Sequence, residues 1–118
     1  MFAKIESRTV LGIEAKKVEV EVDMSGGLPC FTIVGLPDTA VKESRDRVIS
    51  AIKNSGFKFP PKRITINLAP ADLRKEGASF DLAIAVGILV SSGDLEQGHV
   101  DGKVFCGELS LDGGLRPI

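Results

Sequence analysis

The stretch that decides the fold reads Asn67-Leu-Ala-Pro-Ala-Asp-Leu-Arg-Lys-Glu-Gly-Ala-Ser-Phe-Asp81 and runs directly into Leu82-Ala-Ile-Ala-Val-Gly-Ile-Leu89. A polar loop gives way here to a segment that is apolar nearly all round, which predicts a buried helix from about Ser79 to Ser91. The first turn of a helix has unpaired N–H donors and a positive dipole end, which favour an anion, a capping side chain or an oxyanion. Ser79 and Asp81 stand at that turn, so the junction is either a capped helix start or a catalytic serine site.

The segments before this stretch predict strands and one helix. Between residues 2 and 24, Val18, Val20 and Val22 alternate with acidic residues, which is typical of a strand with one wet face, and Gly12 suggests a turn between two antiparallel strands. Residues 30–34 and 63–68 read as further strands. The helix between them should begin with Asp38 as its N-cap and end near Gly56.

That helix has one apolar and one polar side. Its apolar stripe consists of Val41, Val48, Ala51 and Ile52, and its solvated side includes Arg45 and Arg47. After the second helix, which Gly93 ends, residues 104–106 and 108–111 look like hairpin strands, with a turn at Asp112-Gly-Gly114. The order predicts an α+β fold, a two-layer structure with helices packed on a mainly antiparallel or mixed sheet. We expect one domain over residues 1–118, ending before its last strand or helix.

Composition excludes several function classes. With Lys+Arg 15 against Asp+Glu 16, the net charge of -1 gives no bulk attraction to nucleic acid or membrane. No apolar run approaches the length of a membrane span. Cys30 and Cys106 lie far apart in apolar, strand-like surroundings, which favours two buried reduced thiols of a cytosolic protein over a disulfide.

Three segments carry a family resemblance: Phe31-Thr-Ile-Val-Gly-Leu-Pro-Asp38 with Val41-Lys-Glu-Ser44, Ile64-Thr-Ile-Asn-Leu-Ala-Pro-Ala-Asp-Leu73 with Lys75-Glu-Gly77, and Gly107-Glu-Leu-Ser-Leu-Asp-Gly113. Together, and in this order, they resemble the amino-terminal domain of the magnesium-chelatase-like AAA+ ATPases, the family that includes the competence protein ComM. The resemblance implies a fold like that of the Lon proteolytic domain and a ribosomal-protein-type α/β fold. It also implies cytoplasmic bacterial ATPases that assemble as ring homo-oligomers and, for ComM relatives, a role in DNA recombination.

The ATPase machinery is absent from this sequence. No Gly-x-x-x-x-Gly-Lys-Ser/Thr occurs, so ATP and Mg²⁺ are expected only in an AAA+ module outside these 118 residues. The implied partners are that module of the same parent chain, further copies of the protein and possibly DNA, with no membrane. No cofactor is expected within residues 1–118.

Ser79 is the one candidate nucleophile. Lys75-Glu-Gly-Ala-Ser79 is similar to the Lon-type segment Lys-Asp-Gly-Pro-Ser, in which the serine belongs to a Ser–Lys dyad, and a serine needs such a base to lose its proton. Phe80 and Asp81 stand where that pattern has a small residue and a glycine, and its lysine would fall beyond Ile118. The pattern favours Ser79 as an N-cap or first-turn residue, with a Ser–Lys peptidase as the alternative.

Two clusters of charged residues remain as candidate binding sites. Asp72, Lys75, Glu76 and Asp81, with Gly77 and Ser79, form an anion-binding or interface loop, which we expect to be solvated or to contact a neighbouring domain. A basic run with interleaved Phe57 and Phe59 could contact DNA through cations and ring stacking, which leaves a freestanding nucleic-acid module as a further alternative. Its members are Lys53, Lys58, Lys62, Arg63, Arg74 and Lys75.

A metal site is not expected, because His99 is the only histidine and follows Gly98 in a loop. The favoured hypothesis is therefore a noncatalytic domain from the front of a magnesium-chelatase-like AAA+ ATPase. Its tasks would be ring assembly, coupling to the ATPase module or guiding DNA.

Overall fold

A mixed four-stranded sheet forms one layer of the molecule, as the sequence predicts. The computed structural model describes residues 1–75 and 77–116. Its sheet has the order β1-β2-β4-β3, in which β3 runs parallel to β4 and the other neighbours are antiparallel. The strands are β1 (Phe2–Leu11), β2 (Glu14–Ser25), β3 (Cys30–Val34) and β4 (Arg63–Ala69).

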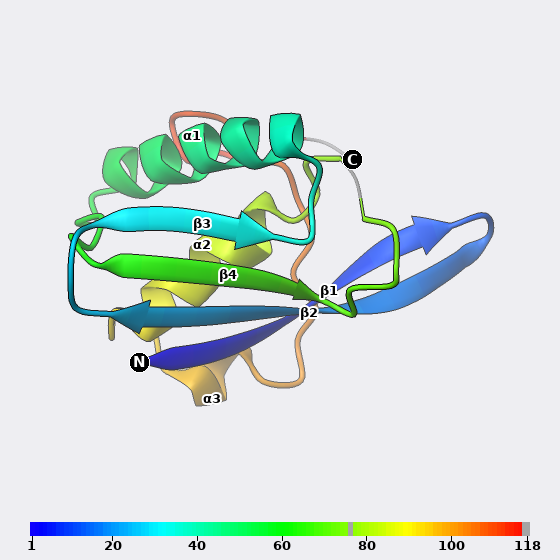
Figure 1. The fold of residues 1–118 in the computed structure, drawn as a ribbon, viewed down its shortest axis with the longest axis horizontal. Coiled ribbons are helices and arrows are strands. Elements are labelled where there is room, and N and C mark those ends of the chain that lie inside the picture. The colour runs from blue at the N-terminus through cyan, green and yellow to red at the C-terminus, as the bar shows by residue number, and fades with distance from the viewer. Residues whose placement is uncertain (76, 117–118) are drawn as a thin grey trace.

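Helices α1 (Asp38–Asn54) and α2 (Asp81–Ser91) form the second layer, and the short α3 (Gln97–Val100) lies near β1 (Figure 1). α2 packs against β1 and β2, and α1 packs against α2 and β3. This is the predicted two-layer α+β arrangement. Among the described residues, no helix combines the length and apolar character that crossing a membrane requires.

The core lies between these two layers and follows from strand alternation. Val20 pairs with Leu68 and Val22 with Ile66, and all four side chains are fully buried. The next residues along these strands point to the other face, where the Asn67 amide donates a hydrogen bond of 2.8 Å to Glu21. Successive side chains of a strand alternate between faces, so the valine pattern alone sets which face of the sheet is buried.

The helix ends differ in detail from the prediction. α1 begins at Asp38 with Pro37 at the N-cap position, and no side chain caps it. Proline suits a helix start because it has no N–H to satisfy, so Asp38 is a first-turn acid rather than the predicted cap. The predicted stop at Gly56 is confirmed, because its backbone has φ +90° just after Asn54. α2 ends two residues before Gly93, as expected.

The β1–β2 pair extends beyond the rest of the sheet. β2 pairs with β4 only from Glu19 to Ser25, so the earlier part of β2 and its partner in β1 project as a two-stranded ribbon (Figure 1). The turn at Gly12 is confirmed, and the next residue, Ile13, is fully exposed at 104%.

The predicted C-terminal hairpin strands at 104–106 and 108–111 are wrong. Only isolated bridges occur there, from Glu6 to Val104 and from Leu109 to Leu115. The segment instead bonds to the loop before α2, where the Gly107 N–H donates to the Ser79 carbonyl at 2.8 Å and the Leu82 N–H donates to the Gly107 carbonyl at 3.1 Å. The predicted turn at 112–114 is confirmed.

Candidate functional site

The predicted site lies where β4 passes into α2, beside the C-terminal segment. Of the six residues proposed for this loop, Asp72, Lys75, Gly77, Ser79 and Asp81 are described, and Glu76 lies outside the described residues. The structure does not hold them as one solvated cluster. Asp72 is exposed, whereas Lys75 and Asp81 are buried and have separate partners.

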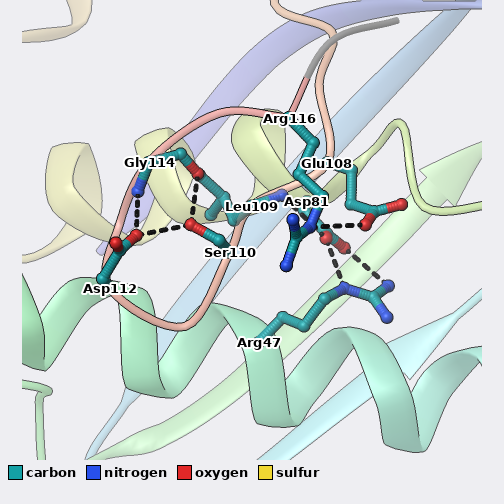
Figure 2. A network of polar contacts seen from close by, with 8 residues as sticks. All are labelled: Arg47, Asp81, Glu108, Leu109, Ser110, Asp112, Gly114 and Arg116. Carbon is teal, nitrogen blue, oxygen red and sulfur yellow. Dashed lines mark hydrogen bonds and ion pairs between the residues drawn. The ribbon is translucent and has the colours of Figure 1, made fainter.

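Asp81 is the centre of a buried polar network at the first residue of α2. Its carboxylate has no exposed surface and accepts hydrogen bonds from the Ser44 hydroxyl at 2.7 Å and from Arg47 Nε at 2.6 Å. The backbone N–H of Leu109 also donates to it, at 3.2 Å. Figure 2 shows Arg47 reaching from α1 to this carboxylate, with Leu109 on its other side. Asp81 therefore ties α1, α2 and the C-terminal segment together.

Arg47 and Ser44 are the site residues that sequence reasoning missed. The helical pattern assigned Arg47 to the solvated side of α1, but its side chain is only 23% exposed and its guanidinium forms an ion pair with Asp81. The hydrogen bond to Asp81 raises the pKa of Arg47, against the opposing effect of burial. Ser44 and Arg47 are three residues apart and so share a face of α1, which is the one signal in the sequence that links them.

Ser79 does not cap α2, so the predicted capping role is wrong. The N-cap position belongs to Phe80, which makes no side-chain cap bond and is only 1% exposed. Ser79 lies one residue earlier in the turn and uses its backbone carbonyl to accept from Gly107. Asp81, one residue after Phe80, meets the positive end of the helix dipole instead.

Lys75 is buried rather than solvated, which corrects the expectation for this loop. It is 4% exposed, and its Nζ donates to the carbonyls of Pro70 at 2.5 Å and Leu73 at 2.6 Å. Burial lowers its pKa, and the charge of Asp72 acts in the opposite direction. In the part of the chain that the structure describes, no hydrogen bond joins this ammonium to the Ser79 hydroxyl.

The glycine of the Gly35-Leu-Pro-Asp38 motif makes room for that lysine. Gly35 has φ +110°, and a Cβ on it would come within 2.9 Å of the Leu68 carbonyl oxygen and 3.2 Å of Lys75 Cε. Only glycine tolerates both this conformation and this close approach. The motif therefore serves the packing of the loop after β4.

The predicted basic run is divided between two ends of the sheet. Arg63 begins β4 and Ala69 ends it, so Arg74 lies beyond the far end of a seven-residue strand from Lys62 and Arg63. At about 3.3 Å per residue, that strand separates them by roughly 20 Å. Lys53 and Lys62 line a groove of about 260 Å³ together with Phe31 and Phe59, and Lys58 and Arg63 are the chain neighbours of Phe59 and Lys62.

The remaining candidates show no catalytic arrangement. His99 is exposed on α3, and its carbonyl accepts from Lys103 Nζ at 2.8 Å. Both cysteines are free thiols, but Cys30 is exposed at the start of β3 and Cys106 is half-buried, so the expected burial of both is wrong. Within residues 1–75 and 77–116, no group of three His, Cys, Asp or Glu side chains could hold a metal ion.

Comparison with known proteins places this arrangement in a family. The chain is 53% identical over 98% of its length to the competence protein ComM of Haemophilus influenzae and to the protein YifB of Salmonella typhimurium. An uncharacterized protein of Mycobacterium bovis is 42% identical over 95% of the chain. The chain spans only about a quarter of the length of these relatives, 23% for the first two.

The family resemblance noted from the three segments is thereby confirmed. Residues 20–118 match the protein family described as the subunit ChlI of Mg-chelatase, which covers all of the site residues discussed above. The chain therefore belongs to the family of the ChlI subunit of magnesium chelatase.

Proposed function

We propose that this chain is a noncatalytic N-terminal domain of a cytoplasmic, magnesium-chelatase-like AAA+ ATPase that remodels DNA during recombination of incoming DNA. The observation that carries the proposal is the 53% identity, over 98% of the chain, to a protein named for competence. ATP and Mg²⁺ would bind to an AAA+ module of the longer parent chain, which would assemble as a ring homo-oligomer. The domain would contribute to ring assembly, to coupling with that module or to guiding DNA.

The contacts of Lys75 and Asp81, the two buried charged residues of the loop, support the noncatalytic part of this proposal. A Ser–Lys dyad needs a lysine amine free to take the serine proton. The Lys75 ammonium is occupied by two backbone carbonyls, and Asp81 is occupied by Arg47, Ser44 and Leu109. Each of these two buried charges thus has hydrogen-bond partners within the domain, and these partners give it a structural role.

The test is ATP hydrolysis by the full-length protein with and without DNA, together with its mass in solution. We expect Mg²⁺-dependent hydrolysis that DNA stimulates, and a ring-sized species in light scattering. A variant lacking residues 1–118 should hydrolyse ATP but lose either DNA stimulation or assembly. Hydrolysis that ignores DNA in the intact protein would contradict a DNA-remodelling role.

A second assay addresses the peptidase alternative. The full-length protein and its Ser79→Ala variant are incubated with unfolded casein and ATP. We expect no cleavage by either protein. Casein cleavage that disappears in Ser79→Ala would overturn the noncatalytic assignment.

A further inference from the structure

Positive charge gathers at the end of the sheet where β3 and β4 begin, and the carboxylate on the adjacent β2 is Asp23, two residues before the register partner of Arg63. Residues 24–37 and 53–71 contain four charged side chains, all of them cations, namely Lys53, Lys58, Lys62 and Arg63. The fold brings these segments together, because Cys30 pairs in register with Arg63 and its N–H donates to the Lys62 carbonyl at 3.3 Å. We call these four residues the basic end.

The cations of the basic end are not paired with carboxylates in the part of the chain that the structure describes. Among the described residues, none of the four forms an ion pair, whereas cations elsewhere in the chain do: Lys4, Arg8, Lys16, Lys17, Arg47 and Arg116. Asp23, on the adjacent β2, pairs in register with Thr65 and forms no ion pair with them. Positive charge that is not paired within the fold attracts a polyanion, although the net charge of the chain is -1.

A groove with aromatic walls is lined by two of these cations, Lys53 and Lys62. It has a volume of about 260 Å³, with Phe31 and Phe59 on its wall and Lys53 and Lys62 beside them. The two rings stack with their centroids 5.7 Å apart and an interplanar angle of 29°. Cys30 and the three prolines Pro29, Pro60 and Pro61 complete the lining, and each proline fixes its own φ angle.

We propose that this groove binds single-stranded nucleic acid, with a base against the Phe31–Phe59 pair and the adjacent phosphates on the basic end. A base in a duplex is already stacked on its neighbours, so the rings are useful only to a strand whose bases are free. The inference rests on the proposed DNA function and assigns DNA binding to one surface of the domain. It leaves out Arg74, which lies at the other end of β4, and Lys75, which is buried.

The probe is a fluorescently labelled oligothymidylate of about 16 nucleotides, titrated with the 118-residue chain at several salt concentrations. Four phosphate contacts on a single strand predict a slope of log K against log salt of about −3. The double variant Lys53→Gln/Lys62→Gln should lower the magnitude of that slope by about 1.4, whereas Lys53→Arg/Lys62→Arg should retain it. Phe59→Leu keeps an apolar side chain against the core but removes a ring, and should weaken binding at least about fivefold.

Matched controls keep the test specific to the groove. Lys16→Gln/Lys17→Gln removes two charges from the ribbon and should leave binding unchanged. Circular dichroism and urea unfolding verify that every variant is folded. Binding that is equally tight to a duplex of the same length, or unaffected by Phe59→Leu in a folded protein, would overturn the stacking site. Absence of salt-dependent binding to oligothymidylate would overturn it as well.

Failure of this inference and failure of the proposed function give different results. If DNA stimulates ATP hydrolysis of the full-length protein while the groove variants bind oligothymidylate normally, the function stands and this site is wrong. If the groove binds as described but DNA leaves ATP hydrolysis unchanged, the site stands and the proposed function is wrong.

Discussion

At the scale of single residues, Asp81 and Lys75 are buried charges whose costs are met in different ways. The Asp81 carboxylate accepts hydrogen bonds from a guanidinium, a hydroxyl and a backbone N–H, so its charge is both paired and hydrogen-bonded. Lys75 has only two carbonyl acceptors and no carboxylate bonded to its Nζ among the described residues. Burying a charge is expensive unless it is paired, which is why the pKa of Lys75 is lowered.

Asp81→Asn should destabilise the domain by about 3 kcal/mol, because it removes one partner of a buried ion pair and leaves Arg47 uncompensated. Urea unfolding followed by circular dichroism measures the change. Asp46→Asn, which alters an exposed carboxylate on the same helix as Arg47, is the control and should have little effect. A loss below about 0.5 kcal/mol in Asp81→Asn would show that the network does not hold the three segments together.

The lowered pKa of Lys75 predicts a pH dependence of stability. Its pKa in the folded state lies below the ordinary value of 10.5, so the unfolded chain binds more protons between those two values. Stability that depends on Lys75 should therefore rise as pH increases through this interval toward 10.5.

The measurement is the free energy of unfolding of the wild type minus that of Lys75→Met, at pH values from neutral upward. Lys62→Met, at an exposed lysine, corrects for the loss of one charge. A difference that falls with rising pH would mean that the Lys75 ammonium is stabilised rather than penalised in the fold.

At the scale of elements, α2 can pack closely on the sheet because it carries a glycine in its middle. A Cβ at Gly87 would lie 2.5 Å from Val22 Cγ2 and 3.3 Å from Ile5 Cγ1, and both of those side chains are buried. Helix propensity alone would favour alanine at this position by about 1 kcal/mol. Packing against β1 and β2 therefore outweighs propensity.

Gly87→Ala should accordingly lower the free energy of unfolding by up to about 2 kcal/mol, since overpacking costs about 1–3 kcal/mol and the gain in helix propensity offsets about 1 kcal/mol of that cost. Thermal and urea unfolding both report the change. Gly98→Ala on α3 is the matched control, because a Cβ there meets nothing within 4 Å. An increase in stability for Gly87→Ala would show that α2 can move away from the sheet at little cost.

At the scale of the whole molecule, residues 104–116 bond to both β1 and the start of α2 although they form no regular strand. Leu109 is 4% exposed within the core, and its N–H bonds to Asp81. Glu108 and Arg116 form an ion pair of 3.3 Å at the surface of the same segment (Figure 2). The segment is thus part of the packed unit.

Leu109→Ala should cost about 2–5 kcal/mol and should do so in one cooperative transition, because the segment unfolds with the rest of the domain. Leu111→Ala, two residues later and 56% exposed, should change stability little. The comparison uses the midpoint and slope of urea unfolding. A separate early transition in Leu109→Ala would indicate that the segment docks independently.

Local pattern alone determined most of the elements of this protein. The alternation of Val18, Val20 and Val22 identifies a half-buried strand, and the apolar run after Asp81 identifies the buried helix, because both periods arise from backbone geometry. Those signals led to the two-layer α+β fold, and three quoted segments led to the family.

Only the tertiary structure decided which charges meet. Asp81 and Arg47 are 34 residues apart, and nothing in the spacing of either predicts their ion pair. The length of β4 separates Arg74 from Lys62, and the loop after β4 buries Lys75 against Gly35. The basic run of the sequence is therefore reduced to a patch of four cations. The physical reason is that hydrophobic periodicity is a property of neighbouring residues, whereas polar partners are chosen by the packing of segments distant in the chain.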